Sequence, residues 1–161
     1  MRPMRRKDRQ VTDFNKIIDI IGRCDCCRLG FWDEEAKQVY IVPLNFGYTV
    51  EGEKVTFYFH GAHEGRKIDL IKKAPSVGFE MDTNYKLNEG DEACEYSARF
   101  QSIIGNGVIS LIEDVEEKKQ GLELLMKHVS GRDGWEYPEQ MLKNMSVMKL
   151  EVEELACKEH E

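Results

Sequence analysis

The sequence predicts a mainly β protein of the α+β kind, in which an antiparallel barrel carries peripheral helices. Six segments have the alternating or continuous apolar pattern of short strands, and few segments have a helical pattern. A doubly wound parallel sheet would instead alternate strands and helices along the whole chain. The six strands are expected at residues 26–32, 39–48, 54–60, 77–81, 99–112 and 146–152.

The helical segments have one apolar face and recognisable ends. In the first, Phe14, Ile17, Ile18 and Ile21 recur at helical spacing, and Thr12 is the expected N-cap. In the third, acidic residues occupy the first turn, where the helix dipole favours them. The helices are expected at residues 11–22, 66–73, 114–129 and 138–144.

Three strand features carry further expectations. The start of segment 39–48 is apolar on both faces, which predicts a central or enclosed strand, and Pro43 should interrupt its pairing. The Gly-Asn-Gly sequence at 105–107 predicts a bulge. Residues 82–97 have no clear period and many acids, so we expect a long loop.

Length and composition indicate one domain over residues 1–161, with a basic arm at 1–10 and a flexible tail at 153–161. The net charge of −7 argues against a nucleic-acid partner, because phosphate neutralisation dominates such binding. No apolar run approaches the roughly 20 residues that span a bilayer, so no membrane partner is expected. The basic N-terminus lacks the apolar stretch of a signal peptide, and we expect a cytoplasmic protein.

The cysteine and histidine spacings indicate no metal site. Of five cysteines, three cluster as Cys24, Cys26 and Cys27, which does not match the usual zinc spacing. Buried thiols that pack as small hydrophobic groups are the simplest interpretation, with Cys24 and Cys26 on one strand face. The four histidines have no metal-ligand spacing either, and no hydrolase or dinucleotide motif is present.

The most informative segment runs from 58 to 71, where a strand enters a glycine-containing loop and then a helix. Unpaired backbone N–H groups at a helix start attract phosphate. Arg66 and Lys67 add two positive charges there, and Gly61 and Gly65 allow close approach of a ligand. This pattern predicts a phosphate site. The alternative is an ordinary β–loop–α connection with solvent-facing basic residues.

Several motifs in order and spacing resemble one family. They are Val-Pro-Leu-Asn-Phe-Gly-Tyr at 42–48, Phe-His-Gly-Ala at 59–62 with Lys67, and Ser-Ile-Ile-Gly-Asn-Gly at 102–107. Residues 4–9 and 27–29 add to the likeness. The chain is similar to the pyridoxamine 5′-phosphate oxidase-like FMN-binding split barrels, and within them to the nitroimidazole-resistance (Nim-type) branch.

The resemblance implies a six-stranded split barrel that forms a homodimer, with FMN in two grooves at the interface. It places Arg66 and Lys67 at the phosphate, and Ser102 and Gly105 near the ribityl chain or ring edge. Trp135 and Tyr137 would come from the other subunit. The residues implied to line or border the flavin ring are Pro43, Leu44, Asn45, Phe46, Phe59, His60, Gly61 and Ala62.

The function that follows is that of a flavin-dependent oxidoreductase acting on a small molecule. NAD(P)H would be the electron donor, a nitroaromatic compound the acceptor by analogy alone, and His60 the catalytic proton donor. The alternatives are a non-catalytic flavin carrier, sensor or storage protein, and a barrel that binds haem. The chain lacks the C-terminal tryptophan–arginine motif of true pyridoxamine phosphate oxidases, which argues against vitamin B6 oxidation.

Overall fold

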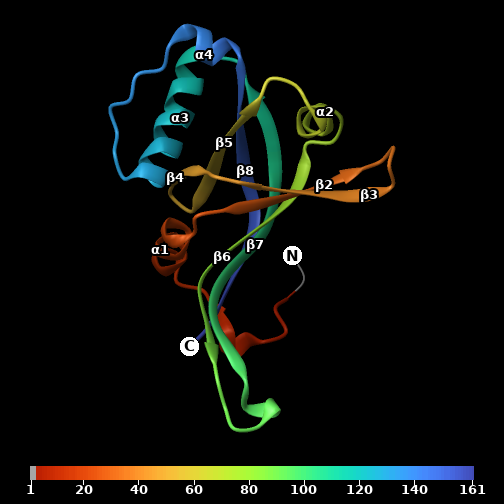
Figure 1. Ribbon diagram of the computed structural model, residues 1–161, viewed down its shortest axis with the longest axis vertical. Helices are drawn as coiled ribbons and strands as arrows, with labels where there is room; N and C mark the ends of the chain where they lie inside the picture. Colours follow the sequence, from red (N-terminus) through yellow and green to blue (C-terminus); the bar gives the residue numbers. More distant parts are fainter. Residues whose placement is uncertain (1–2) are drawn as a thin grey trace.

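Eight antiparallel strands form one sheet in the computed structural model, which describes residues 3–161 (Figure 1). The order across the sheet is β3-β2-β6-β7-β8-β5-β4, and β1 pairs with β8. The strands are β1 (Gln10–Val11), β2 (Cys27–Asp33), β3 (Gln38–Leu44), β4 (Gly47–Glu51), β5 (Lys54–Ala62), β6 (Ser76–Asn88), β7 (Ser97–Ile112) and β8 (Met145–His160). The helices are α1 (Phe14–Arg23), α2 (Arg66–Lys73), α3 (Val115–Ser130) and α4 (Glu139–Lys143), with 3-10 turns at η1 (Lys7–Arg9) and η2 (Ala93–Glu95).

The two outer strands of the sheet, β3 and β4, are consecutive in the chain. Leu44 at the end of β3 pairs with Cys27 of β2, whereas Gly47 at the start of β4 pairs with Tyr58 of β5. The step through Asn45 and Phe46 therefore joins the two edges covalently, with no ladder between them. This open arrangement confirms the predicted antiparallel split barrel with peripheral helices. Eight strands are present instead of six, because the predicted strand 39–48 divides at this step and β1 is an addition.

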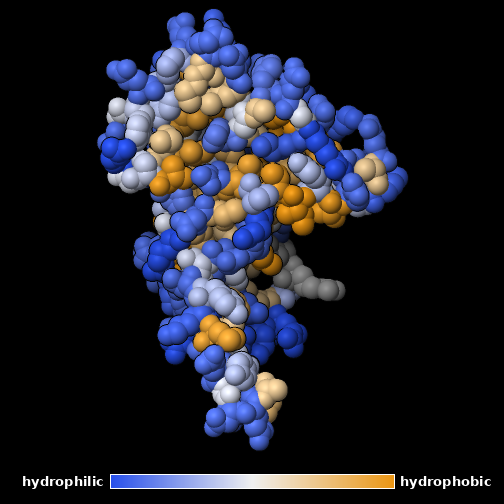
Figure 2. All heavy atoms as spheres, in the orientation of Figure 1, coloured by the Kyte–Doolittle hydropathy of each residue, from blue (hydrophilic) through white to orange (hydrophobic). Residues whose placement is uncertain are grey.

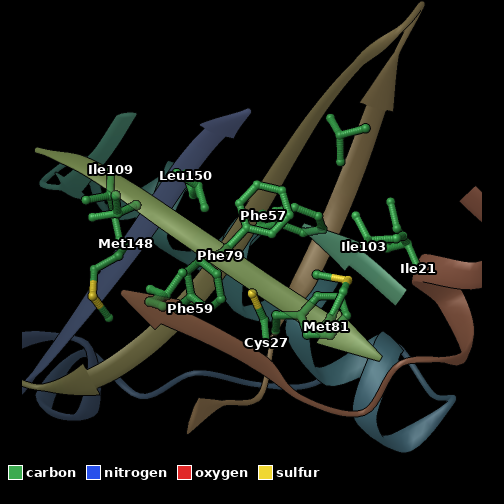
Figure 3. Close-up of a cluster of buried hydrophobic side chains, with 14 of the residues drawn as sticks. Ile21, Cys27, Phe57, Phe59, Phe79, Met81, Ile103, Ile109, Met148 and Leu150 are labelled. Atoms are coloured by element: carbon green, nitrogen blue, oxygen red, sulfur yellow. The ribbon is translucent and has the colours of Figure 1, made fainter. Parts of the chain in front are cut away.

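The core lies inside the curved sheet and follows the predicted alternation. Val55, Phe57 and Phe59 of β5 are all buried, and their intervening neighbours face outward. Phe57 and Phe59 pack with Phe79 of β6 and with Met148 and Leu150 of β8 (Figure 3). Burying such side chains stabilises a fold by about 1.5–3 kcal/mol each. The apolar residues of β5 therefore hold the strand that leads to the predicted phosphate site.

Helix α1 begins one residue later than a Thr12 cap would place it. Asp13 is the N-cap, and its Oδ1 accepts hydrogen bonds from the backbone N–H groups of Asn15 and Lys16. Ile17 and Ile21 are buried as predicted, together with Ile20. Helix α2 occupies the predicted range 66–73, and α3 and α4 lie within a residue of theirs.

Three expectations about strands are wrong, each because packing cannot be inferred from a local pattern. Strand β3 is an edge strand, and Val39 and Ile41 are 61% and 63% exposed. The expected loop 82–97 is half strand: residues 82–88 and 97 belong to the exposed strands of a β6–β7 hairpin, which carry no apolar period, and residues 89–96 connect them. The expected flexible tail at 153–161 instead continues β8 to His160, which pairs with Phe100 of β7.

Two smaller expectations are confirmed in part. The predicted bulge is present as a register shift between Asn106 and Gly107, although Pro43 itself keeps its place opposite Arg28. Cys27 is buried in β2, but Cys24 caps the end of α1 and shares no strand with the half-buried Cys26. The basic arm continues into η1 and β1, and its residues 1–2 lie outside the described residues.

Candidate functional site

The junction between β5 and α2 forms an open corner at one end of the sheet. Gly65 is the N-cap of α2 with a φ of 135°, a value that favours glycine, and no side chain caps the helix. The first N–H groups of α2 therefore have no side-chain acceptor and are available to an anion. His60 and Ala62 at the end of β5 are exposed, whereas Phe59, which precedes them in the strand, is buried in the core.

Lys67 is the basic residue that faces this corner. A Cβ atom added to Gly61 would lie 2.8 Å from Nζ of Lys67, so the ammonium group rests directly on the glycine backbone. Burial lowers the pKa of Lys67, and within residues 3–161 no carboxylate offsets that effect. A half-buried ammonium group without an acidic partner is costly to the free protein and is well suited to a bound anion.

His60 adds a second group that gains charge in acid. Although the side chain is exposed, partial desolvation lowers the pKa of His60, and the nearby positive charge of Lys67 lowers it further. The pKa values of both Lys67 and His60 are thus lower than usual, and a bound anion would raise them by stabilising the charged forms. Two such bases beside a helix start constitute a candidate phosphate site.

Arg66 does not share this corner with Lys67. Its Nε and one terminal nitrogen donate to Oδ2 of Asp33 at 3.0 and 2.8 Å, and its guanidinium lies 4.5 Å from the ring centre of Tyr40. Asp33 also accepts hydrogen bonds from the backbone N–H groups of Ala36 and Glu35. The bond from Ala36 and the bond from Arg66 are the main causes that lower the pKa of Asp33. In this structure Arg66 therefore ties α2 to the β2–β3 turn.

The step between β3 and β4 adjoins β5, because Gly47 at the start of β4 pairs with Tyr58, two residues before His60. Pro43 and Asn45 are exposed, Leu44 packs against the core, and the side chain of Phe46 is fully buried. The structure thus places the β3–β4 step next to the strand that carries His60. Because the Phe46 ring is buried, only the backbone of Phe46 remains accessible to a ligand.

Ser102 and Gly105 lie far from this corner within one chain. Along β8, His60 is level with Val147, whereas Gly105 is level with Leu155. At about 3.3 Å per residue, the two rows are separated by roughly 26 Å of strand. Gly105 is also packed closely against Phe79.

Trp135 and Tyr137 belong to the loop between α3 and α4, and α3 and α2 lie on opposite sides of β5 (Figure 1). The Tyr137 hydroxyl donates to Oε2 of Glu123 at 3.0 Å, and the pKa of Tyr137 is raised to about 12, first by burial and then by this bond. Trp135 stacks with Arg132, its ring centre 4.7 Å from the guanidinium carbon. Neither aromatic side chain reaches α2 of its own chain.

Sequence reasoning missed two residues that fix the segments around the corner. Asp33 engages Arg66, and His128 of α3 contacts the β3–β4 step through a hydrogen bond to the Phe46 carbonyl. Their partners are 33 and 82 positions away, so no local pattern signals either contact. Among residues 3–161 no group of histidine, cysteine and acidic side chains is arranged to hold a metal ion. None of the helices in that range has the length and apolar character needed to cross a membrane.

The fold and the corner together define a split-barrel protein with a cationic site at one end of its sheet. A model of the pyridoxamine 5′-phosphate oxidase family matches residues 13–159, and the chain belongs to that family. No curated protein matches the sequence.

Solved structures share this fold. A candidate 5-nitroimidazole antibiotic resistance protein from Bacteroides thetaiotaomicron is 32% identical, with a TM-score of 0.80 over 92% of this chain and 85% of that one. The flavocytochrome Anf3 from Azotobacter vinelandii is 18% identical, with a TM-score of 0.76 over 99% and 72%. An FAD-binding protein from Mesorhizobium loti is 17% identical, with a TM-score of 0.65 over 95% and 98%.

Proposed function

We propose that the protein binds FMN, with the flavin phosphate at the corner between β5 and α2. The observation that carries this proposal is the Lys67 ammonium, which rests on the Gly61 backbone beside His60 and has no acidic partner among residues 3–161. One compact cationic corner suits the single terminal phosphate of FMN. The flavin named for two structures of the same fold supports a flavin as the ligand class.

The residues around the corner fit such a ligand. Lys67 and His60 would hold the phosphate together with the first N–H groups of α2, and the absence of a side chain at Gly61 leaves room for close approach. The backbone of the β3–β4 step would border the flavin ring. Arg66 would act at one remove by fixing the start of α2 to Asp33.

The corresponding activity is that of an oxidoreductase of a small molecule, with NAD(P)H as donor. A bound flavin supplies the electron-transfer chemistry, and the protein binds, orients and shields it. His60 would serve as a proton donor at the mouth of the site once a bound anion raises its lowered pKa and favours the protonated form. A nitroaromatic acceptor is supported by the name of the 32% identical structure.

The site is open in one chain, which supports a homodimer as the functional form. Trp32, Val39 and Ile41 are large apolar side chains exposed beside an apolar cleft that Gly30, Gly78 and Phe79 help to line. Figure 2 shows hydrophobic residues gathered at the β2–β3 hairpin, which is next in the chain to the β3–β4 step. A second copy would cover this face and bring its own 131–137 loop or β7 residues to the flavin.

Absorption spectroscopy of the purified protein tests the cofactor, with mass spectrometry of the compound released on denaturation. We expect a flavin spectrum and the mass of FMN. Anaerobic bleaching by NADH or NADPH, followed by reoxidation on addition of a nitroaromatic, supports the oxidoreductase. A flavin that neither nucleotide reduces would indicate a carrier or sensor, a haem spectrum would indicate the haem alternative, and a protein that binds no flavin refutes the proposal. Light scattering checks the dimer.

A further inference from the structure

Helix α3 holds the β3–β4 step from the side opposite its exposed face. Nδ1 of His128 lies 2.8 Å from the carbonyl oxygen of Phe46, and the His128 and Phe46 rings are 4.4 Å apart between centres. A Cβ atom at Gly47 would lie 2.3 Å from the backbone nitrogen of Leu125. The backbone of the step is thus in direct contact with the backbone of the helix.

The hydrogen bond assigns a definite state to His128. A carbonyl oxygen only accepts, so Nδ1 must carry the proton and donate it. Asn45 and Phe46 have no ladder partner in either adjoining strand. The His128 bond is therefore a polar contact that anchors the step, and the buried Phe46 ring and the close approach at Gly47 constrain the step by packing.

We propose that His128 is a positioning residue for the flavin ring. By holding the Phe46 carbonyl toward α3, it fixes the plane of the Phe46–Gly47 peptide and with it the backbone of the step that would border the flavin ring. This inference rests on the proposed FMN site. It concerns a residue that touches neither the phosphate corner nor the ring.

His128→Phe tests this role, because it keeps an aromatic ring of similar size and removes the donor. We expect FMN affinity of the full-length apoprotein to fall about tenfold, the net value of one hydrogen bond at the upper end of its range. His128→Asn keeps an N–H donor at the position of Nδ1 and should stay within about threefold of wild type. The flavin absorption bands should shift in His128→Phe and stay unchanged in His128→Asn.

Leu142→Ala in α4 is the control that distinguishes positioning from a general loss of stability. It truncates a buried side chain that does not contact the step. This control should lower the melting temperature and leave FMN affinity unchanged. Amide hydrogen exchange at Asn45–Gly47 in the apoprotein should quicken in His128→Phe alone. Wild-type affinity and spectrum in His128→Phe would overturn the positioning role, as would an affinity loss equal to that of the control. Wild-type protein that binds no FMN would overturn the proposed function itself, and the positioning role with it.

Discussion

Replacing Lys67 by methionine should move stability and ligand affinity in opposite directions. The substitution keeps an unbranched apolar stem against Gly61 and removes the ammonium group. Because burial lowers the pKa of Lys67 and, in the described part of the chain, no acid offsets this, the charge destabilises the free protein. The melting temperature of the apoprotein should therefore rise in Lys67→Met.

FMN affinity of the same variant should fall. Losing one hydrogen bond to a charged group costs about 1.5–3 kcal/mol, which corresponds to a dissociation constant about ten- to a hundredfold larger. Quenching of flavin fluorescence during titration of the apoprotein measures this constant. Differential scanning calorimetry of the apoprotein measures the stability.

His63→Ala is the matched control, because His63 is an exposed residue of the loop that leads into α2. It should leave both quantities near their wild-type values. Equal FMN affinity in Lys67→Met and His63→Ala would refute the phosphate site. A lower melting temperature in Lys67→Met would refute the argument that the Lys67 charge destabilises the free protein.

Two further predictions concern titratable groups. The pKa of His60 lies below its ordinary 6.5 in the free protein, and a bound anion should raise it. The FMN affinity of the wild type, relative to that of His60→Asn, should therefore increase as the pH falls below about 6.5. A ratio of the two affinities that does not change with pH would contradict this. In the same window the apoprotein should lose stability, since the unfolded chain binds the proton more readily than the folded one. Burial raises the pKa of Cys24 to about 12 and the pKa of Cys157 to about 11. In the native protein a thiol reagent should therefore modify the exposed Cys94 first, and it should modify Cys24 and Cys157 only on unfolding. Peptide mass mapping measures which cysteines are modified.

Local signals were sufficient for the corner itself. The alternation of Val55, Phe57 and Phe59 predicted which face of β5 is buried, and therefore that His60 faces outward. Gly65 and the proline after Ala74 marked the ends of α2. The positions of Lys67 and His60 at one site follow from these short-range patterns.

Long-range pairing decided what the local pattern could not. Arg66 and Lys67 are neighbours with the same charge, yet one is engaged by Asp33 and the other faces the corner. Strand β3 has the composition of a central strand but lies at an edge, because its neighbour in the chain crosses to the other end of the sheet. Ser102 and Gly105 were grouped with the corner by resemblance, and within one chain they lie far along β8 from it.

The amino-acid sequence by itself determined the strand-and-helix order and the basic corner at the start of α2, since both depend on residues within a few positions of one another. Only the tertiary structure decided that Arg66 is an anchor, that no acid in the described part of the chain partners Lys67, and that His128 holds the β3–β4 step. Each of those outcomes depends on which distant groups are brought within a few ångströms, and that follows from the packing of the whole chain.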